Sequence, residues 1–326
     1  MSIGEHLRGL GGLPAYQFPD PAKDVDAQAV ALSRLPAADG VAWRISADPY
    51  DAEETWPEAF GRFLDTVDPA QVRAIIVGSW ADAYDNRPDD VIDAIITARE
   101  QLPALRALFV GDIIGEECEI SWINQGEVTR LLDAFPQLEE FGVRGGERLE
   151  FPAVRHENLR TLKVQAGGLP VAVVRGVAAS ELPSLRDLEL WLGTSEYGGD
   201  ADVTDLAPIL AGDQLPSLKR LALRNSEIQD AVCAAVASAP VVARLDALDL
   251  SMGVLTDDGA AALLGGQPLT HLKSLDLHHN YVSKEIGARL ADTLTAAGVE
   301  LNLDTDDAYS DEDDDGSVWR FVSVGE

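Results

Sequence analysis

A short apolar pattern recurs along most of this 326-residue chain. An apolar residue is followed by two variable residues, an apolar residue, one variable residue and a further apolar residue. Seven clear copies begin 33, 21, 26, 33, 27 and 27 residues apart. They are LRALFV (105–110), LEEFGV (138–143), LRTLKV (159–164), LRDLEL (185–190), LKRLAL (218–223), LDALDL (245–250) and LKSLDL (272–277). VRAIIV (72–77) also fits, and VAWRIS (41–46) and VELNLD (299–304) are weaker copies.

Each copy predicts one short strand, because alternate side chains of a strand point to the same face of a sheet. The segments between copies carry helical patterns, such as DDVIDAIITAREQL and SKEIGARLADTLTAA. No such unit can bury its apolar face alone, so neighbouring units must stack. The sequence therefore predicts an α/β solenoid, with about ten parallel strands on the concave side and helices on the convex side. We expect residues 1–39 to form an N-terminal cap, 40–303 the solenoid and 304–326 an acidic spacer with a strand-like tail.

The repeated units resemble leucine-rich repeats, and the 27-residue steps with helical returns are similar to the ribonuclease-inhibitor-like subclass. The asparagine that usually follows the strand in such repeats is present as Asn225 and Asn280. This resemblance implies a non-enzymatic module that binds a protein or peptide on its concave face.

The net charge of −31 narrows the range of partners. Such an acidic surface repels phosphate backbones and anionic lipids, so neither nucleic acid nor a membrane is an expected partner. A protein or peptide with basic contact residues fits this charge better. The two cysteines are too few for a disulfide framework, and Cys233 lies in an apolar helical pattern. With no secretory signal at the N-terminus, we expect a cytoplasmic protein.

Stacking the C-terminal copies places two columns of variable residues on the concave face. One column contains Glu189, Ala222, Asp249, Asp276 and Asn302, and the other contains Trp191, Arg224, Ser251, His278 and Asp304. Adjacent strands lie about 4.8 Å apart, so Asp249 and Asp276 should repel each other unless something positive is bound. Two interpretations stay open: a solvated acidic face, or a site for a cation, a basic peptide or the metal of an enzyme that uses Asp249, Asp276 and His278.

Two further observations concern metal binding and catalysis. Asp311, Asp313 and Asp315 followed by Gly316 match the start of a calcium loop, but the position that should be glutamate is Val322. Catalytic motifs are absent from the sequence, so we expect no enzymatic activity and no cofactor.

Four aromatic residues could be contact points for a partner or parts of the core: Trp80, Phe109, Trp191 and Trp319.

The last residues, SVWRFVSV, alternate in the manner of a strand. They could pair with the last repeat strand as a cap on the sheet edge. Alternatively, the eight acids in the stretch from Asp304 to Ser317 could hold an extended spacer that presents the tail to a partner. In that case Trp319, Arg320, Phe321 and Val322 would be the recognised residues.

The whole chain, with an ending like WRFVSVGE, resembles a family of bacterial cytoplasmic leucine-rich-repeat proteins. We associate the genes of that family with neighbours that resemble radical-SAM and ATP-grasp enzymes. The resemblance implies an alternative function, in which the chain is a leader-like substrate whose tail is presented to modifying enzymes.

Overall fold

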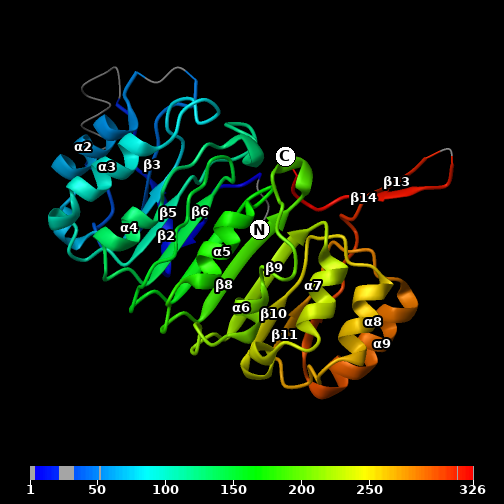
Figure 1. The fold of residues 1–326 in the computed structure, drawn as a ribbon. Helices are drawn as coiled ribbons and strands as arrows, with labels where there is room; N and C mark the ends of the chain where they lie inside the picture. Colours follow the sequence, from blue (N-terminus) through cyan, green and yellow to red (C-terminus); the bar gives the residue numbers. More distant parts are fainter. Residues whose placement is uncertain (1–3, 22–32, 51–52, 314, 326) are drawn as a thin grey trace. The chain divides into compact units, whose positions relative to one another are not determined.

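The computed structural model of the chain describes residues 4–21, 33–50, 53–313 and 315–325. It forms two compact units, Met1–Glu150 and Phe151–Glu326, called unit 1 and unit 2 below. Within the described residues, each unit consists of a mostly parallel open sheet and helices (Figure 1).

Unit 1 contains six described strands in chain order. Strands β2 to β6 are parallel to their neighbours, and β1 is antiparallel to β2. The strands are β1 (Gly9–Leu10), β2 (Leu13–Gln17), β3 (Ala42–Ile45), β4 (Ala74–Val77), β5 (Ala107–Val110) and β6 (Glu140–Arg144). The described helices are α2 (Trp56–Thr66), α3 (Asp89–Thr97) and α4 (Thr129–Ala134).

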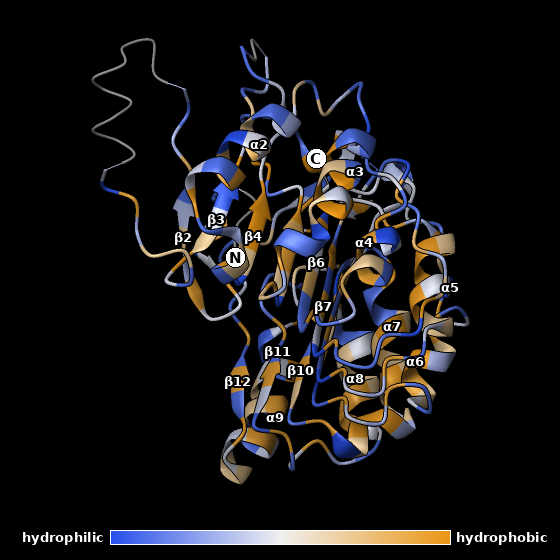
Figure 2. Ribbon diagram, turned by 90° about the vertical axis from the view of Figure 1, so that its left-hand side faces the viewer, coloured by the Kyte–Doolittle hydropathy of each residue, from blue (hydrophilic) through white to orange (hydrophobic). Residues whose placement is uncertain are grey.

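Unit 2 has the same kind of arrangement, with six described parallel strands. They are β7 (Thr161–Gln165), β8 (Asp187–Gly193), β9 (Arg220–Ser226), β10 (Ala247–Asp249), β11 (Ser274–Asp276) and β12 (Glu300–Asn302). The helices are α5 (Val171–Ala179), α6 (Ala207–Ala211), α7 (Gln229–Val236), α8 (Asp257–Gly265) and α9 (Lys284–Leu294). Figure 2 shows α6, α7 and α8 together on one side of strands β7, β10 and β11.

The recurring apolar residues fill the space between strands and helices. In unit 2, Leu188, Leu190, Leu221 and Leu223 are all completely buried. The residues between them point to the opposite side of the sheet, which none of the described helices covers and which is called the helix-free face. The strand and helix pattern of the central chain is therefore confirmed, as is the burial of Cys233 in α7.

The sheet begins earlier in the chain than the predicted start of the solenoid at residue 40. Strand β2 lies inside the predicted cap of residues 1–39 but pairs in parallel with β3, so the sheet begins before residue 40. The pattern search missed β2 because LPAYQ lacks the repeated apolar spacing.

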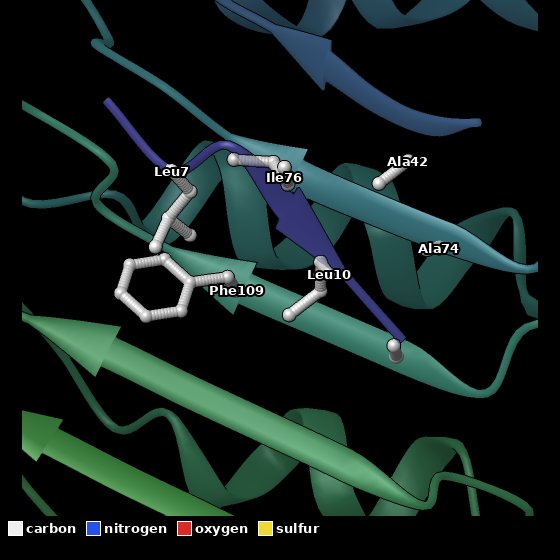
Figure 3. Packing of buried hydrophobic residues seen from close by; sticks show 7 residues of the cluster. Leu7, Leu10, Ala42, Ala74, Ile76 and Phe109 are labelled. Carbon is white, nitrogen blue, oxygen red and sulfur yellow. The ribbon is translucent and has the colours of Figure 1, made fainter. Parts of the chain in front are cut away.

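The segment around β1 lies across the helix-free face of unit 1 (Figure 3). Leu7 and Leu10 pack there against Ala74, Ile76 and Phe109 from β4 and β5. The two N-terminal leucines thereby cover this part of the helix-free face, including Phe109, which is one of the four aromatic candidates.

A buried carboxylate fixes this N-terminal segment. Asp112 is completely buried and accepts hydrogen bonds from the backbone N–H of Leu7 at 3.0 and 3.2 Å. The guanidinium of Arg44 donates to Asp112 and to the carbonyl of Leu7, and the Arg144 guanidinium lies 3.6 Å from Asp112. The charge of Asp112 is thus balanced inside the protein, as a buried charge requires.

In the part of the chain that the structure describes, none of the helices has the length and apolar character needed to cross a bilayer.

Candidate functional site

The strand register of unit 2 aligns the first predicted column of the helix-free face, called the acidic column, as expected. This column contains Glu189, Ala222, Asp249, Asp276 and Asn302. Asp249 is the partner of Asp276 in the sheet, and Asp276 is the partner of Asn302. On the other side, Asp249 and Glu189 are both partners of Ala222, and Trp191 is the partner of Arg224. The sequence pattern alone therefore identified which side chains share this part of the helix-free face.

The positive charge that these carboxylates need comes from the chain itself. The guanidinium of Arg220 lies 2.9 Å from Asp187, 3.3 Å from Glu189 and 2.9 Å from Asp249. The Arg224 guanidinium lies 3.2 Å from Asp249 and 3.8 Å from Glu189. Arg220 was not among the candidate residues, although it is a variable residue of the copy LKRLAL and lies on the same strand face as Arg224.

The electrostatics agree with this geometry. Burial raises the pKa of Glu189, but Arg224, Arg220, Lys163 and the indole N–H of Trp191 outweigh burial and hold that pKa below its ordinary value. Glu189 and Asp249 are each 6% exposed. The network is therefore an internal ion cluster, in which Arg220 and Arg224 supply positive charge to Glu189 and Asp249.

Three of the four aromatic candidates belong to the core. Trp80, Phe109 and Trp191 are 4%, 1% and 1% exposed. The indole of Trp191 donates to Glu189 at 2.9 Å, and the Arg224 guanidinium lies 5.7 Å from the Trp191 ring centre. Trp191 thus supports the ion cluster and offers almost no surface to a partner.

The exposed end of the column lies at β11 and β12. A hollow of about 170 Å³ is lined there by Asp276, His278, His279, Asn302, Asp304 and Asp307. Burial raises the pKa of Asp276, but the hydrogen bonds from the ring and backbone of His278 outweigh it and hold the pKa below its ordinary value. The described residues contain no group of three or more His, Cys, Asp or Glu side chains arranged to hold a metal ion. Asp249, Asp276 and His278 are therefore not gathered into such a group among the described residues.

The calcium-like motif forms the turn of a hairpin. Asp311 lies in β13 (Ser310–Glu312), which pairs antiparallel with β14 (Val318–Arg320). Asp313 accepts a hydrogen bond from the Trp319 indole at 2.7 Å, and Asp315 accepts one from the backbone of Ser317 at 2.9 Å. Gly316 adopts φ 85°, which suits a tight turn. These three carboxylates have separate local roles.

This hairpin contradicts the pairing that was predicted for a C-terminal cap. Strand β12 pairs with β11, and β14 pairs with β13 and not with the last repeat strand. The acidic stretch from Asp304 to Ser317 is also not a plain extended spacer, because Ser310–Glu312 within it form β13. The hydrophobic side chains in and next to the hairpin are nevertheless displayed, since Tyr309, Val318, Trp319 and Phe321 are 63%, 46%, 57% and 48% exposed.

The residues after the hairpin return to the body of unit 2. Val322 and Val324 are 9% and 4% exposed, so the recognition role predicted for Val322 would require its release. Tyr281 joins this segment to the hairpin. Its hydroxyl accepts from the N–H of Phe321 at 3.0 Å and can donate to the carbonyl of either Phe321 or Tyr309. The Arg320 guanidinium lies 5.7 Å from the Tyr281 ring centre.

A second hollow, of about 460 Å³, lies in unit 1 and was not found from the sequence. Its lining includes Asp20, Asp48, Glu54 and Glu117 together with His6. Burial raises the pKa of Asp20 and of Glu117. Internal bases already contact two of the acids: Arg62 lies 2.7 Å from Glu54, and His6 lies 3.8 Å from Glu117.

Comparisons with known proteins address the fold. No protein-family model matches the sequence, and no curated protein matches it. Among solved structures, a Bacteroides fragilis protein determined by a structural genomics consortium is similar, with a TM-score of 0.72 and 29% sequence identity. The similarity covers 82% of this chain and 73% of that chain. It supports a repeat-like α/β fold and carries no assignment of function.

Proposed function

We propose that this chain is a non-enzymatic protein-interaction module of the leucine-rich-repeat type, and that its C-terminal hairpin is the main contact for a partner. The observation that carries the proposal is the display of Tyr309, Val318, Trp319 and Phe321 on residues 309–321. Exposed aromatic side chains gathered on one element are typical of binding surfaces, where tryptophan and tyrosine often dominate the binding energy.

The chemistry of the partner follows from what surrounds these side chains. The rings of Tyr309 and Phe321 stack with their centres 5.9 Å apart, which makes a flat apolar surface. Acidic side chains flank it, and the exposed residues Asn302 and Asp304 lie nearby in the chain. A protein with an apolar groove bordered by lysine or arginine would complement this surface.

The helix-free face is a weaker candidate than the hairpin for the contact with a partner. In unit 1 the N-terminal leucines cover it, and in unit 2 the ion cluster of Asp187, Glu189, Arg220, Arg224 and Asp249 neutralises it. The exposed residues Asn302 and Asp304, with the partly exposed Asp276 and His278, support a role for that face as the border of the hairpin contact.

The test is affinity capture followed by measured binding of the captured partner. We expect Val318→Ser with Trp319→Ala to weaken binding at least tenfold, because both side chains are exposed on β14 of the hairpin. A matched variant, Tyr84→Ala with Trp122→Ala, removes the exposed aromatic pair of unit 1, whose centres are 5.8 Å apart, and should bind normally. Equal binding by both variants would disprove the proposal, and binding should weaken as salt is raised from about 0.05 to about 0.3 M.

The alternative function as a leader-like substrate requires that the terminal residues be accessible to enzymes. Enzymes that modify the terminal residues need access to Val322 and Val324, which are buried, so the segment would first have to leave unit 2. Intact mass of the protein from its native host, compared with protein expressed alone, tests this alternative. Identical masses would exclude it.

A further inference from the structure

Three residues of unit 2 share an unusual backbone conformation and a fixed spacing. Asn225, Met252 and His279 have φ values of 53°, 69° and 48°, in the left-handed region that non-glycine residues seldom adopt. They stand 27 residues apart, so they occupy equivalent repeat positions, near the end of β9 and shortly after β10 and β11. Successive repeats thus place three equivalent turns in a row, called the turn row below.

The terminal segment Phe321–Gly325 crosses the turn row with one contact at each turn. The N–H of Val324 donates to the Asn225 carboxamide oxygen at 2.9 Å, and the Asn225 NH₂ donates to the Val324 carbonyl at 2.6 Å. The N–H of Ser323 donates to the carbonyl of Met252 at 2.8 Å. The Nε2 of His279 lies 3.4 Å from the carbonyl of Phe321.

The spacing explains this match. Two steps between adjacent parallel strands cover about 9.6 Å, and three residues of extended chain cover about 10 Å. An extended segment can therefore contact every turn of the row without bending. The direction of the segment is opposite to the direction in which the repeats advance, because Phe321 meets the last of the three turns and Val324 the first.

The side chains of the segment alternate in burial. Val322 and Val324 are buried, whereas Phe321 and Ser323 are exposed. A Cβ atom at Gly325 would lie 3.3 Å from the Tyr197 ring, so glycine allows the chain to pass close to that ring. The turn row thus selects β-branched side chains at alternate positions, followed by a glycine.

The side chain of Asn225 is satisfied by the terminal segment. Asn280, which stands one position after His279 two repeats later, instead bonds to the backbone of Leu250, Leu255 and Leu277 within the repeats. Asn225 is completely buried, yet its carboxamide bonds to Val324 of the terminal segment. Buried polar groups left without partners are costly, so an empty turn row would carry an unsatisfied amide.

We propose that the turn row is a peptide-binding site for an extended segment of the type Val-x-Val-Gly, filled by the chain's own tail and open to the tail of a second copy. The connection from Asp304 to Arg320 is exposed along most of its described length, so the segment can leave without disturbing the repeats. The matching sequence is this chain's own, and exchange of an identical element between copies is a known route to dimers. The proposal does not depend on the role of the hairpin as a partner contact.

The experiment starts from the folded full chain. A protease site inserted between Gly316 and Ser317, in the hairpin turn, allows the tail to be cut after folding. A fluorescent peptide of residues 318–325 is then added and its anisotropy followed. We expect saturable replacement of the resident fragment. The peptide with Val322→Asp and Val324→Asp should bind at least tenfold more weakly, whereas Ser323→Ala, at an exposed position, should bind as the native peptide does.

The second measurement concerns two copies. Uncut chains carrying donor and acceptor dyes at Ser310 are mixed, and energy transfer and mass are followed over time. Tail exchange predicts concentration-dependent dimers that are lost with Val322→Asp and Val324→Asp together. A resident fragment that never exchanges, a cut protein that unfolds, or equal binding of the aspartate peptide would each overturn the site. Peptide exchange with no dimers at any concentration would overturn the second copy as its occupant.

Discussion

At the residue scale, the most informative positions are polar side chains that the fold has buried. A guanidinium lies close to each of the buried carboxylates of Asp112, Glu189 and Asp249. The carboxamide of Asn225 donates a hydrogen bond to the backbone carbonyl of Val324. Burial of such groups is tolerated because each finds a partner of opposite charge or complementary hydrogen bonding. His279 differs, since its Nδ1 atom is buried and lacks a hydrogen-bond partner among the described residues.

His279 should make the stability of the protein depend on pH. Burial lowers the pKa of His279 from its ordinary value of 6.5; His278 adds to this effect, and Phe321 and Asp307 oppose it. Below pH 6.5 the unfolded chain therefore binds more protons than the folded one. Stability should fall as the pH decreases through this range, by at most about 1.4 kcal/mol per pH unit for one group.

The check is denaturant unfolding of the wild type and of His279→Gln between about pH 7.5 and about pH 5.5, on either side of the ordinary histidine pKa. Because glutamine does not titrate, the difference in unfolding free energy between the two proteins should shift in favour of the variant as the pH falls. A difference that is constant over this range would contradict the prediction.

Arg220 should be the most sensitive residue of the ion cluster. Replacing it with methionine leaves Glu189 and Asp249 with Arg224 as their nearby base, and removing one member of a buried ion cluster costs about 3 kcal/mol. The pKa of Glu189 is held low in the wild type. The difference in unfolding free energy between the wild type and Arg220→Met should therefore become smaller as the pH falls below about 4.5 and the carboxylate becomes protonated. Arg155→Met, at an exposed pair with Glu157 and Glu181, is the control and should change the unfolding free energy little.

At the element scale, the apolar repeat predicted the central strands, because leucine spacing and strand pairing have the same physical cause. The same spacing correctly aligned Asp249, Asp276 and Asn302. It could not reveal which side chains would neutralise the column, since that depends on how far the long Arg220 side chain reaches across strands. The short strands β1 and β13 were also missed, because two or three residues carry too little pattern.

The segment around β1 should contribute strongly to the stability of unit 1. Leu10 is 5% exposed and covers side chains of β4 and β5, so Leu10→Ala should cost about 2–3 kcal/mol. Glu5→Ala, in an exposed ion pair with Arg8, is the matched control and should have a small effect. Hydrogen exchange can locate the effect: faster exchange should appear in β3, β4 and β5. Unchanged exchange there would mean that the N-terminal segment is only loosely held.

At the scale of the whole molecule, two kinds of electrostatic interaction oppose each other. The net charge of −31 places many carboxylates on the surface, where their mutual repulsion destabilises the folded chain. Inside, the clusters around Asp112 and Arg220 are attractive and partly shielded from solvent. Salt weakens interactions between exposed charges over a Debye length of about 10 Å at 0.1 M and affects buried pairs much less.

Added salt should therefore stabilise this protein, because it screens the surface repulsion more than the internal attraction. We expect the melting temperature to rise by several degrees between about 0.01 and about 0.3 M sodium chloride, with most of the rise below about 0.15 M. Potassium chloride should give the same rise, since screening depends on ionic strength and not on a particular cation. A variant with Asp306, Asp307, Asp311 and Glu312 changed to Asn or Gln should respond less. A melting temperature that falls with salt would show that exposed ion pairs, and not repulsion, dominate the surface.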